Sequence, residues 1–251
     1  MVKLLDSEVW KTIQGYWNEG NRSTVVWTAC DTMKITIGDI EDLLSETSIS
    51  NHCVDAYSHV LMEKKNPLVP TFDLLTPTDN AFIVKSYFKD IINNKEEEHL
   101  NNTLVATIPK PVRARYLLFP ILHKFHWTLL VLDKVEAKWK FYNSRIKRTG
   151  GQQDENCTAT NYLREVVTTY LNNEPREIDQ PTIHDTVEMV KDSPQQGAAS
   201  LDCAIYVISI MTKHIMNEPL SNLTITKKDC RDVRAEMIHS FMKTNGSNGA
   251  S

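Results

Sequence analysis

The stretch "SPQQGAASLDCAIYVISIM" (Ser193–Met211) decides how this chain is expected to fold. Polar residues and one glycine lead into Asp202 and Cys203, and apolar residues then continue almost without interruption to Met216. A helix without a polar face is a buried helix. The pattern therefore predicts a buried helix over 203–216, with a cysteine in its first turn and a polar loop before it.

The position of Cys203 favours a reactive thiol. A helix N-terminus carries about half a positive charge, which stabilises a thiolate. The alternative is a buried structural cysteine, and position alone leaves both interpretations open. Neither a disulfide framework nor a zinc knuckle is supported, because the five cysteines are odd in number, widely spaced and without a C-x-x-C motif: Cys30, Cys53, Cys157, Cys203 and Cys230.

The order of the expected elements predicts an α+β fold. Helical spacing occurs at 36–45, 51–65 and 78–94, and again at 158–173 and 228–243. Between these two groups lie three runs rich in aromatic and branched residues, which are typical of adjacent antiparallel strands: 115–123, 126–133 and 138–144.

No internal repeat or low-complexity linker divides the chain, so we expect a single domain over 1–251. Its three expected parts are a helical part at about 1–110, a sheet and catalytic core at about 111–220, and a C-terminal helix with a frayed tail at 221–251. Residues 1–35 are expected either to cover part of a substrate face or to pack on the core.

A nucleophilic thiol needs a base, and the base needs a group that orients it. His126 opens one expected strand and Asn143, 17 positions later, closes the next. In a hairpin of this length the first residue of one strand lies close to the last of the other. A side-chain amide of Gln195 or Gln196, with the backbone N–H of Cys203, would complete an oxyanion hole. Taken singly, each of these residues also has an ordinary structural interpretation.

These segments resemble a known family. "FHWTLLVLD", "WKFYNS" and "PQQGAASLDCAIYV" resemble, in this order, the catalytic core of the ubiquitin-like-protein proteases, the SUMO/sentrin-specific cysteine peptidases of peptidase clan CE. "SISNHCVDAYSHVL" (48–61) resembles the family's earlier helix, which begins with a Trp-Leu-Asn-Asp type motif. The resemblance implies a papain-like core, with a mainly antiparallel central sheet flanked by helices and a nucleophile at the N-terminus of a buried helix.

The resemblance also implies catalytic roles. Cys203 would be the nucleophile, His126 the general base, Asn143 the orienting residue and Gln196, or else Gln195, the oxyanion donor. Two departures from the family pattern lie among these residues and beside them: Asn143 replaces an acid, and Ala204 replaces the glycine after the cysteine. The spacer between the glutamines and Asp-Cys is also one residue longer than usual.

The substrate side departs further from the family pattern. Trp127 would line a narrow tunnel that admits a Gly-Gly C-terminus, because only a tail without Cβ atoms can lie flat over the sulfur. Ser48 replaces the tunnel tryptophan of the earlier motif, and Asn51 replaces the acid that would contact the modifier.

The function implied is a thiol protease, without a cofactor or metal, that cleaves after the C-terminal Gly-Gly of a ubiquitin-like modifier. SUMO is the first candidate, and the reaction would serve either maturation or deconjugation. One alternative is a weak or inactive pseudoprotease that binds a ubiquitin-like or other protein partner. A second is an acyltransferase on the same scaffold, although no motif for an acyl donor is present.

Composition narrows the remaining partners and the compartment. A net charge of −4 gives no reason to expect nucleic acid as a partner. The N-terminus lacks the apolar core of a signal peptide and no run is long enough to span a bilayer, so an intracellular protein, nuclear or cytoplasmic, is expected without a membrane partner. His123 and His126 are three apart in a strand and would point to opposite faces, which disfavours a metal pair.

Overall fold

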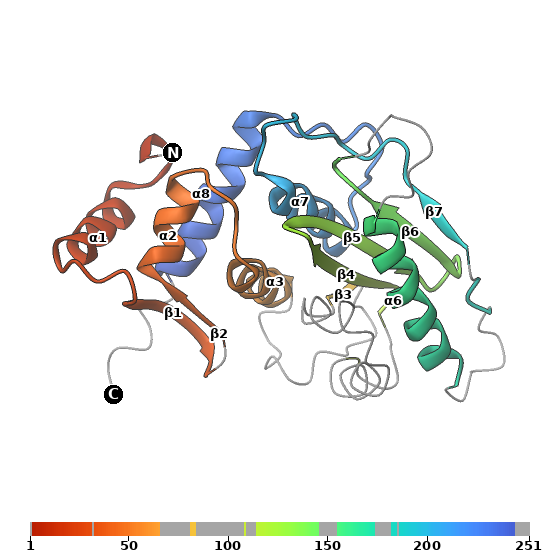
Figure 1. The fold of residues 1–251 in the computed structure, drawn as a ribbon. Helices are drawn as coiled ribbons and strands as arrows, with labels where there is room; N and C mark the ends of the chain where they lie inside the picture. Colours follow the sequence, from red (N-terminus) through yellow and green to blue (C-terminus); the bar gives the residue numbers. More distant parts are fainter. Residues whose placement is uncertain are drawn as a thin grey trace.

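The computed structural model describes residues 2–31, 33–65, 81–83, 108, 114–145, 155–173, 182–184 and 186–243. At its centre is a five-stranded sheet in the order β3-β4-β5-β6-β7 (Figure 1). The three central strands are antiparallel, and the short outer strands run parallel to their neighbours. The strands are β3 (Ala81–Ile83), β4 (Tyr116–His123), β5 (His126–Asp133), β6 (Lys138–Tyr142) and β7 (Val187–Met189).

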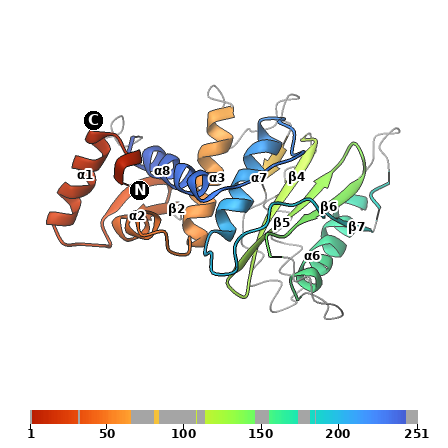
Figure 2. The same ribbon diagram turned by 90° about the horizontal axis from the view of Figure 1, so that it is seen from above.

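Both faces of this sheet are apolar and covered by helices. Every residue of β5 is buried, as expected when side chains that alternate between the two faces both meet a hydrophobic layer. Leu129 and Val131 contribute to the cluster that contains α7 (Cys203–Ile215), while Leu130 and Leu132 contribute to the cluster that contains α6 (Glu155–Asn172). Figures 1 and 2 show these two helices on opposite faces of the sheet.

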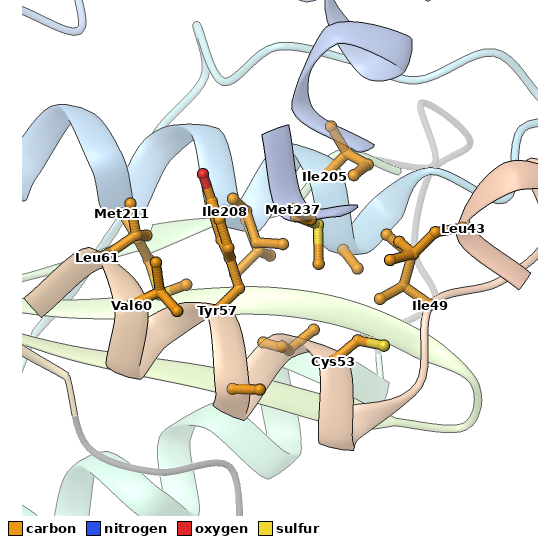
Figure 3. Close-up of a cluster of buried hydrophobic side chains, with 14 of the residues drawn as sticks. Leu43, Ile49, Cys53, Tyr57, Val60, Leu61, Ile205, Ile208, Met211 and Met237 are labelled. Atoms are coloured by element: carbon orange, nitrogen blue, oxygen red, sulfur yellow. The ribbon is translucent and has the colours of Figure 1, made fainter. Parts of the chain in front are cut away.

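The helix α7 lies deep in the protein. Ten of its 13 residues are buried, which confirms the buried helix predicted over 203–216. It packs between the sheet and the helices α3 (Asn51–Lys65) and α8 (Lys227–Lys243). Figure 3 shows this interface, in which Tyr57 and Val60 of α3 and Met237 of α8 lie close to Ile208 and Met211 of α7.

The start of α3 is held by a network of caps. Thr36 and Asp39 form a capping box at the start of α2 (Ile37–Leu44). Asp39 also accepts a hydrogen bond from the Ser50 hydroxyl at 3.1 Å, and Ser50 in turn accepts from the backbone N–H of Cys53 at 3.2 Å. The predicted helices at 36–45 and 51–65, with Ser50 as the cap, are therefore confirmed.

The N-terminal residues pack on the core. The segment comprises η1 (Val2–Leu4), α1 (Ser7–Asn18) and a hairpin of β1 (Val25–Cys30) and β2 (Met33–Thr36). The buried residues of α1 are Val9 and Ile13, and the helix contacts α2 and α8. Of the two roles expected for residues 1–35, core packing is the one that α1 fills; the hairpin was not predicted.

One predicted helix is wrong where it can be compared. Residues 81–83 lie inside the helix expected over 78–94 but form the strand β3, which pairs in parallel with Tyr116–Leu118 of β4. Phe82 and Ile83 are good strand residues, and the ladder offered by β4 overrides the local helical spacing. The other residues of 78–94 lie outside the described part of the chain. Among the helices that the structure describes, none is both long and apolar enough to cross a membrane.

Candidate active site

The two strand-end residues meet as the sequence predicts. His126 begins β5 and Asn143 follows the last residue of β6, and the antiparallel pairing of the two strands brings these ends together. The imidazole Nε2 of His126 lies 2.8 Å from the side-chain Oδ1 of Asn143. The side chains are almost entirely removed from solvent, with exposed fractions of 6% for His126 and 1% for Asn143.

The contacts of Asn143 also fix the tautomer of the imidazole. The same Oδ1 accepts a hydrogen bond from the backbone N–H of Arg145 at 2.8 Å. An amide N–H can only donate, so the atom that it meets must be the carbonyl oxygen of Asn143 rather than the nitrogen. His126 Nε2 must then carry a hydrogen to share that oxygen. In the neutral ring the lone pair therefore lies on Nδ1, which makes Nδ1 the basic nitrogen.

The two glutamines attach the loop before α7 to the end of β6. The Gln195 amide nitrogen donates to the backbone carbonyls of Asn143, at 2.8 Å, and Ser193, at 3.0 Å. Gln196 donates its backbone N–H to the carbonyl of Ser144 at 2.9 Å. Its side chain accepts from the Ser144 hydroxyl at 3.1 Å and donates to the Ser200 carbonyl at 3.3 Å.

Cys203 is the first residue of α7 and is 6% exposed. Tyr206, in the first turn of α7, donates its hydroxyl to the carbonyl of Gln195 at 3.4 Å, and the side chain of Gln195 in turn donates to the carbonyl of Asn143. Cys203 and Trp127, the neighbour of His126, also belong to one buried cluster. The structure thus places the expected nucleophile on the helix that packs against the strand bearing the expected base.

The three expected substrate-contacting residues differ in exposure. Trp127 is buried, with an exposed fraction of 2%, whereas Ser48 and Asn51 are exposed at the start of α3. Ile49, between the two polar residues, points into the core. The segment before them is linked to the nucleophile helix because Arg234 of α8 binds both the carbonyl of Thr47 and the side chain of Asp202, each at 2.8 Å. Sequence reasoning did not find Arg234, since its partners lie far away along the chain.

Two other cysteines have environments that oppose ionisation. Burial, together with the charge of Asp39, raises the pKa of the Cys53 thiol far above its ordinary value. Burial, together with the charge of Asp202, raises the pKa of Cys230 to about 12. Both therefore remain neutral thiols at physiological pH, as expected for cysteines with a packing role. Within the described ranges, no three His, Cys, Asp or Glu side chains are grouped so as to hold a metal ion.

Residues 33–245 match the model of the Ulp1 protease family, C-terminal catalytic domain. The chain belongs to the Ulp1 protease family. The match includes every residue assigned above to the site, and it confirms the family resemblance seen in the sequence motifs.

Solved structures show that the fold is shared. A structure of the SUMO protease Ulp1 with its catalytic cysteine oxidised to a sulfenic acid is 15% identical, with a TM-score of 0.68 and 96% of each chain covered. The Ulp1 protease domain in complex with Smt3, the yeast ortholog of SUMO, is 16% identical with a TM-score of 0.67, again with 96% of each chain covered. The Ulp1-like SUMO protease catalytic domain of Chaetomium thermophilum is 17% identical with a TM-score of 0.65, with 98% of this chain and 92% of that chain covered. No curated protein sequence matches the chain.

Proposed function

We propose that this protein is a thiol protease that cleaves after the C-terminal Gly-Gly of a SUMO-type modifier. The observation that carries the proposal is the buried His126–Asn143 pair, whose hydrogen bonds direct a basic Nδ1 away from Asn143. This pair lies at the start of the strand against which α7, headed by Cys203, packs. Membership of the Ulp1 protease family and the complex of a similar domain with Smt3 support the choice of modifier.

The reaction begins at the sulfur. His126 Nδ1 takes the thiol proton of Cys203 as Sγ attacks the carbonyl carbon of the terminal glycine. The C–N bond then breaks, the amine leaves with the proton returned by His126, and a thioester remains. Water attacks this thioester with His126 again as the base, which releases the modifier carboxylate and restores the thiol. Asn143 holds the ring in the Nε2–H tautomer throughout.

The oxyanion of the tetrahedral intermediate needs two preorganised donors. One is the backbone N–H of Cys203 at the start of α7, where helix amides lack intrahelical acceptors. For the second we favour Gln196 over Gln195. The Gln195 amide already donates to two backbone carbonyls, whereas the Gln196 amide has one such bond, at the longer distance of 3.3 Å. Gln195 then has a supporting role, because it binds the carbonyl of Asn143.

The substrate wall would be less confining than the family motif specifies. Buried Trp127 would form the wall on one side, while exposed Ser48 would offer only a small side chain on the α3 side. Asn51 offers an amide where a carboxylate would pair with a basic residue of the modifier. We therefore expect weaker recognition of the modifier tail, seen as a raised KM rather than a lowered kcat.

The test is the reaction of the purified chain with SUMO, ubiquitin and a Nedd-type modifier, each ending in an electrophile at the terminal glycine. Cys203→Ala is the control variant. We expect a covalent adduct with the SUMO probe that is lost in the control, together with release of a C-terminal extension from a SUMO precursor. An adduct without cleavage of either the precursor or a SUMO–lysine conjugate would refute the protease and favour a binding protein. No adduct with any probe, from a chain shown to be folded, would refute the proposal as a whole.

A further inference from the structure

A fully buried arginine lies behind the start of α7. The side chain of Arg234, in the middle of α8, has no exposed surface. Its guanidinium donates at 2.8 Å to Asp202 Oδ1 and at 2.8 Å to the backbone carbonyl of Thr47, with a longer contact of 3.5 Å to the carbonyl of Leu43. A charge this deeply buried is costly unless it is paired, so these contacts are required for the arginine to be there at all.

The partner of this arginine occupies a special position. Asp202 is the N-cap of α7, immediately before Cys203. An aspartate at an N-cap ordinarily accepts hydrogen bonds from the backbone N–H groups of the first helical turn. Asp202 makes no such bond. Its Oδ1 binds Arg234, and its Oδ2 accepts instead from the hydroxyl of Ser200 at 2.9 Å.

A capping carboxylate would work against the chemistry proposed for this helix start. It would place a full negative charge beside the thiolate and the tetrahedral oxyanion, and like charges disfavour both species. It would also occupy a backbone amide of the first turn. The contact with Arg234 removes both effects, because it neutralises the carboxylate and turns it away from the helix amides.

Resting on the proposed function, we propose that Arg234 is a positioning residue that keeps the Asp202 carboxylate off the N-terminus of α7. The positive end of α7 is thereby reserved for the sulfur of Cys203 and for the oxyanion of the intermediate. The same guanidinium holds the carbonyl of Thr47, directly before Ser48. One buried side chain thus ties the segment that would contact the modifier to the helix that would attack it.

Two acidic groups of the described residues that lie near the pair have partners of their own. Glu46 is paired with Arg231 at 2.8 Å, and Asp229 accepts hydrogen bonds from Thr226. Cys230 and Tyr206 also feel the Asp202 charge, and both remain neutral because their pKa values are raised by burial. Among the described residues, Arg234 is the ionisable group that contacts the Asp202 carboxylate, and the other partner of that carboxylate is the hydroxyl of Ser200.

The experiment is a double-mutant cycle on the full chain with the pH profile of Cys203 alkylation as its readout. Iodoacetamide is applied from pH 5 to 10, and the rate is followed on the Cys203 peptide by mass spectrometry. The four proteins are the wild type, Arg234→Gln, Asp202→Asn and the double variant. Because alkylation needs no modifier, the result is independent of whether the SUMO probe reacts.

Arg234→Gln frees the Asp202 charge, so the midpoint of its profile should rise by about one pH unit, a roughly tenfold slower reaction below the midpoint. Adding Asp202→Asn removes that charge and should return the midpoint to within a few tenths of the wild type. A merely structural role for Arg234 predicts no such rescue. An unchanged midpoint in folded Arg234→Gln, or a double variant that stays shifted with it, would overturn the proposal.

Arg234→Gln leaves the half-buried Asp202 carboxylate without its partner, and the variant can fail to fold. The comparison of Asp202→Asn with the double variant then decides, since neither contains that carboxylate. Without the carboxylate Arg234 has nothing to hold, so the two midpoints should agree within a few tenths of a pH unit. A double variant whose midpoint lies a full unit above that of Asp202→Asn would show that Arg234 acts on the sulfur without Asp202, and the proposal would be wrong.

Discussion

Replacing Asn143 by aspartate tests the proposed catalytic pair with a change of very few atoms. The Oδ1 of Asn143 already accepts from His126 Nε2 and from the backbone N–H of Arg145, both at 2.8 Å. A carboxylate can keep both bonds, because it only accepts. The perturbation is therefore a single negative charge next to an imidazole that becomes positive during the reaction.

The magnitude follows from distance and burial. Two unit charges about 4 Å apart interact by about 4 kcal/mol at an effective dielectric of about 20. Asn143 is only 1% exposed, and removing the new carboxylate from water cancels a large part of this energy. A net gain of about 1 to 2 kcal/mol remains for the charged imidazolium, which corresponds to a roughly tenfold faster acylation near neutral pH. The alkaline limb, where the imidazolium loses its proton, should also move up by about one pH unit.

The assay is single-turnover cleavage of a SUMO conjugate with a fluorogenic C-terminal amide, measured from pH 5 to 10. Asn143→Leu is the matched control, since it fills the site without accepting a hydrogen bond. We expect Asn143→Asp to be faster than the wild type and Asn143→Leu to be slower by about 10- to 100-fold. Equal rates and equal limbs in all three folded proteins would show that Asn143 does not act on His126, and the assignment of both residues would be refuted.

Three further predictions concern His214, Phe125 and the two glutamines. His214 is buried against Tyr142, and desolvation lowers its pKa from 6.5 to about 4. Between these two pH values the unfolded chain binds a proton that the folded chain does not, so the free energy of unfolding should fall by about 3 kcal/mol as the pH falls through this window. In urea unfolding, His214→Leu should flatten this pH dependence. Phe125 is 96% exposed at φ 61°, so Phe125→Gly should relieve backbone strain and raise the free energy of unfolding by about 1 kcal/mol; an unchanged urea midpoint would contradict this. Gln196→Ala should lower kcat by about 100-fold. Gln195→Ala should lower kcat less and the thermal midpoint more, because the Gln195 amide makes the shorter bonds, at 2.8 and 3.0 Å, against 3.1 and 3.3 Å for the Gln196 side chain. The reverse pattern would exchange their roles.

The parts of the site that the sequence reveals are those set by local pattern. The start of β5 and the end of β6 are visible as ends of apolar runs, so the meeting of His126 with Asn143 could be predicted from a short hairpin. The apolar run after Asp202 likewise predicts α7. The strand β3 could not be predicted, because three residues owe their conformation to the ladder of β4 rather than to their own spacing.

Arg234 shows the other kind of limit. In the sequence it is one basic residue in an amphipathic helix, where a solvated side chain is the ordinary expectation. Its burial depends on partners from two distant places, the carbonyl of Thr47 and the carboxylate of Asp202. The departure of Asp202 from ordinary capping was equally hidden, since a helix N-cap followed by an apolar run predicts the usual cap. Only the folded arrangement shows that this carboxylate is turned away.

The substitutions of Asn143 and Arg234 can be combined in one test, because these two residues share no partner among their described contacts. Asn143→Asp adds a charge that favours the thiolate–imidazolium pair, whereas Arg234→Gln frees a charge that disfavours the thiolate. Independent sites contribute additively to free energy, so the opposite shifts should cancel in the double variant. Its alkylation midpoint should lie within a few tenths of a pH unit of the wild type. A double variant as impaired as Arg234→Gln alone would mean that losing the arginine misplaces Cys203 itself, because added charge at Asn143 cannot restore a displaced sulfur.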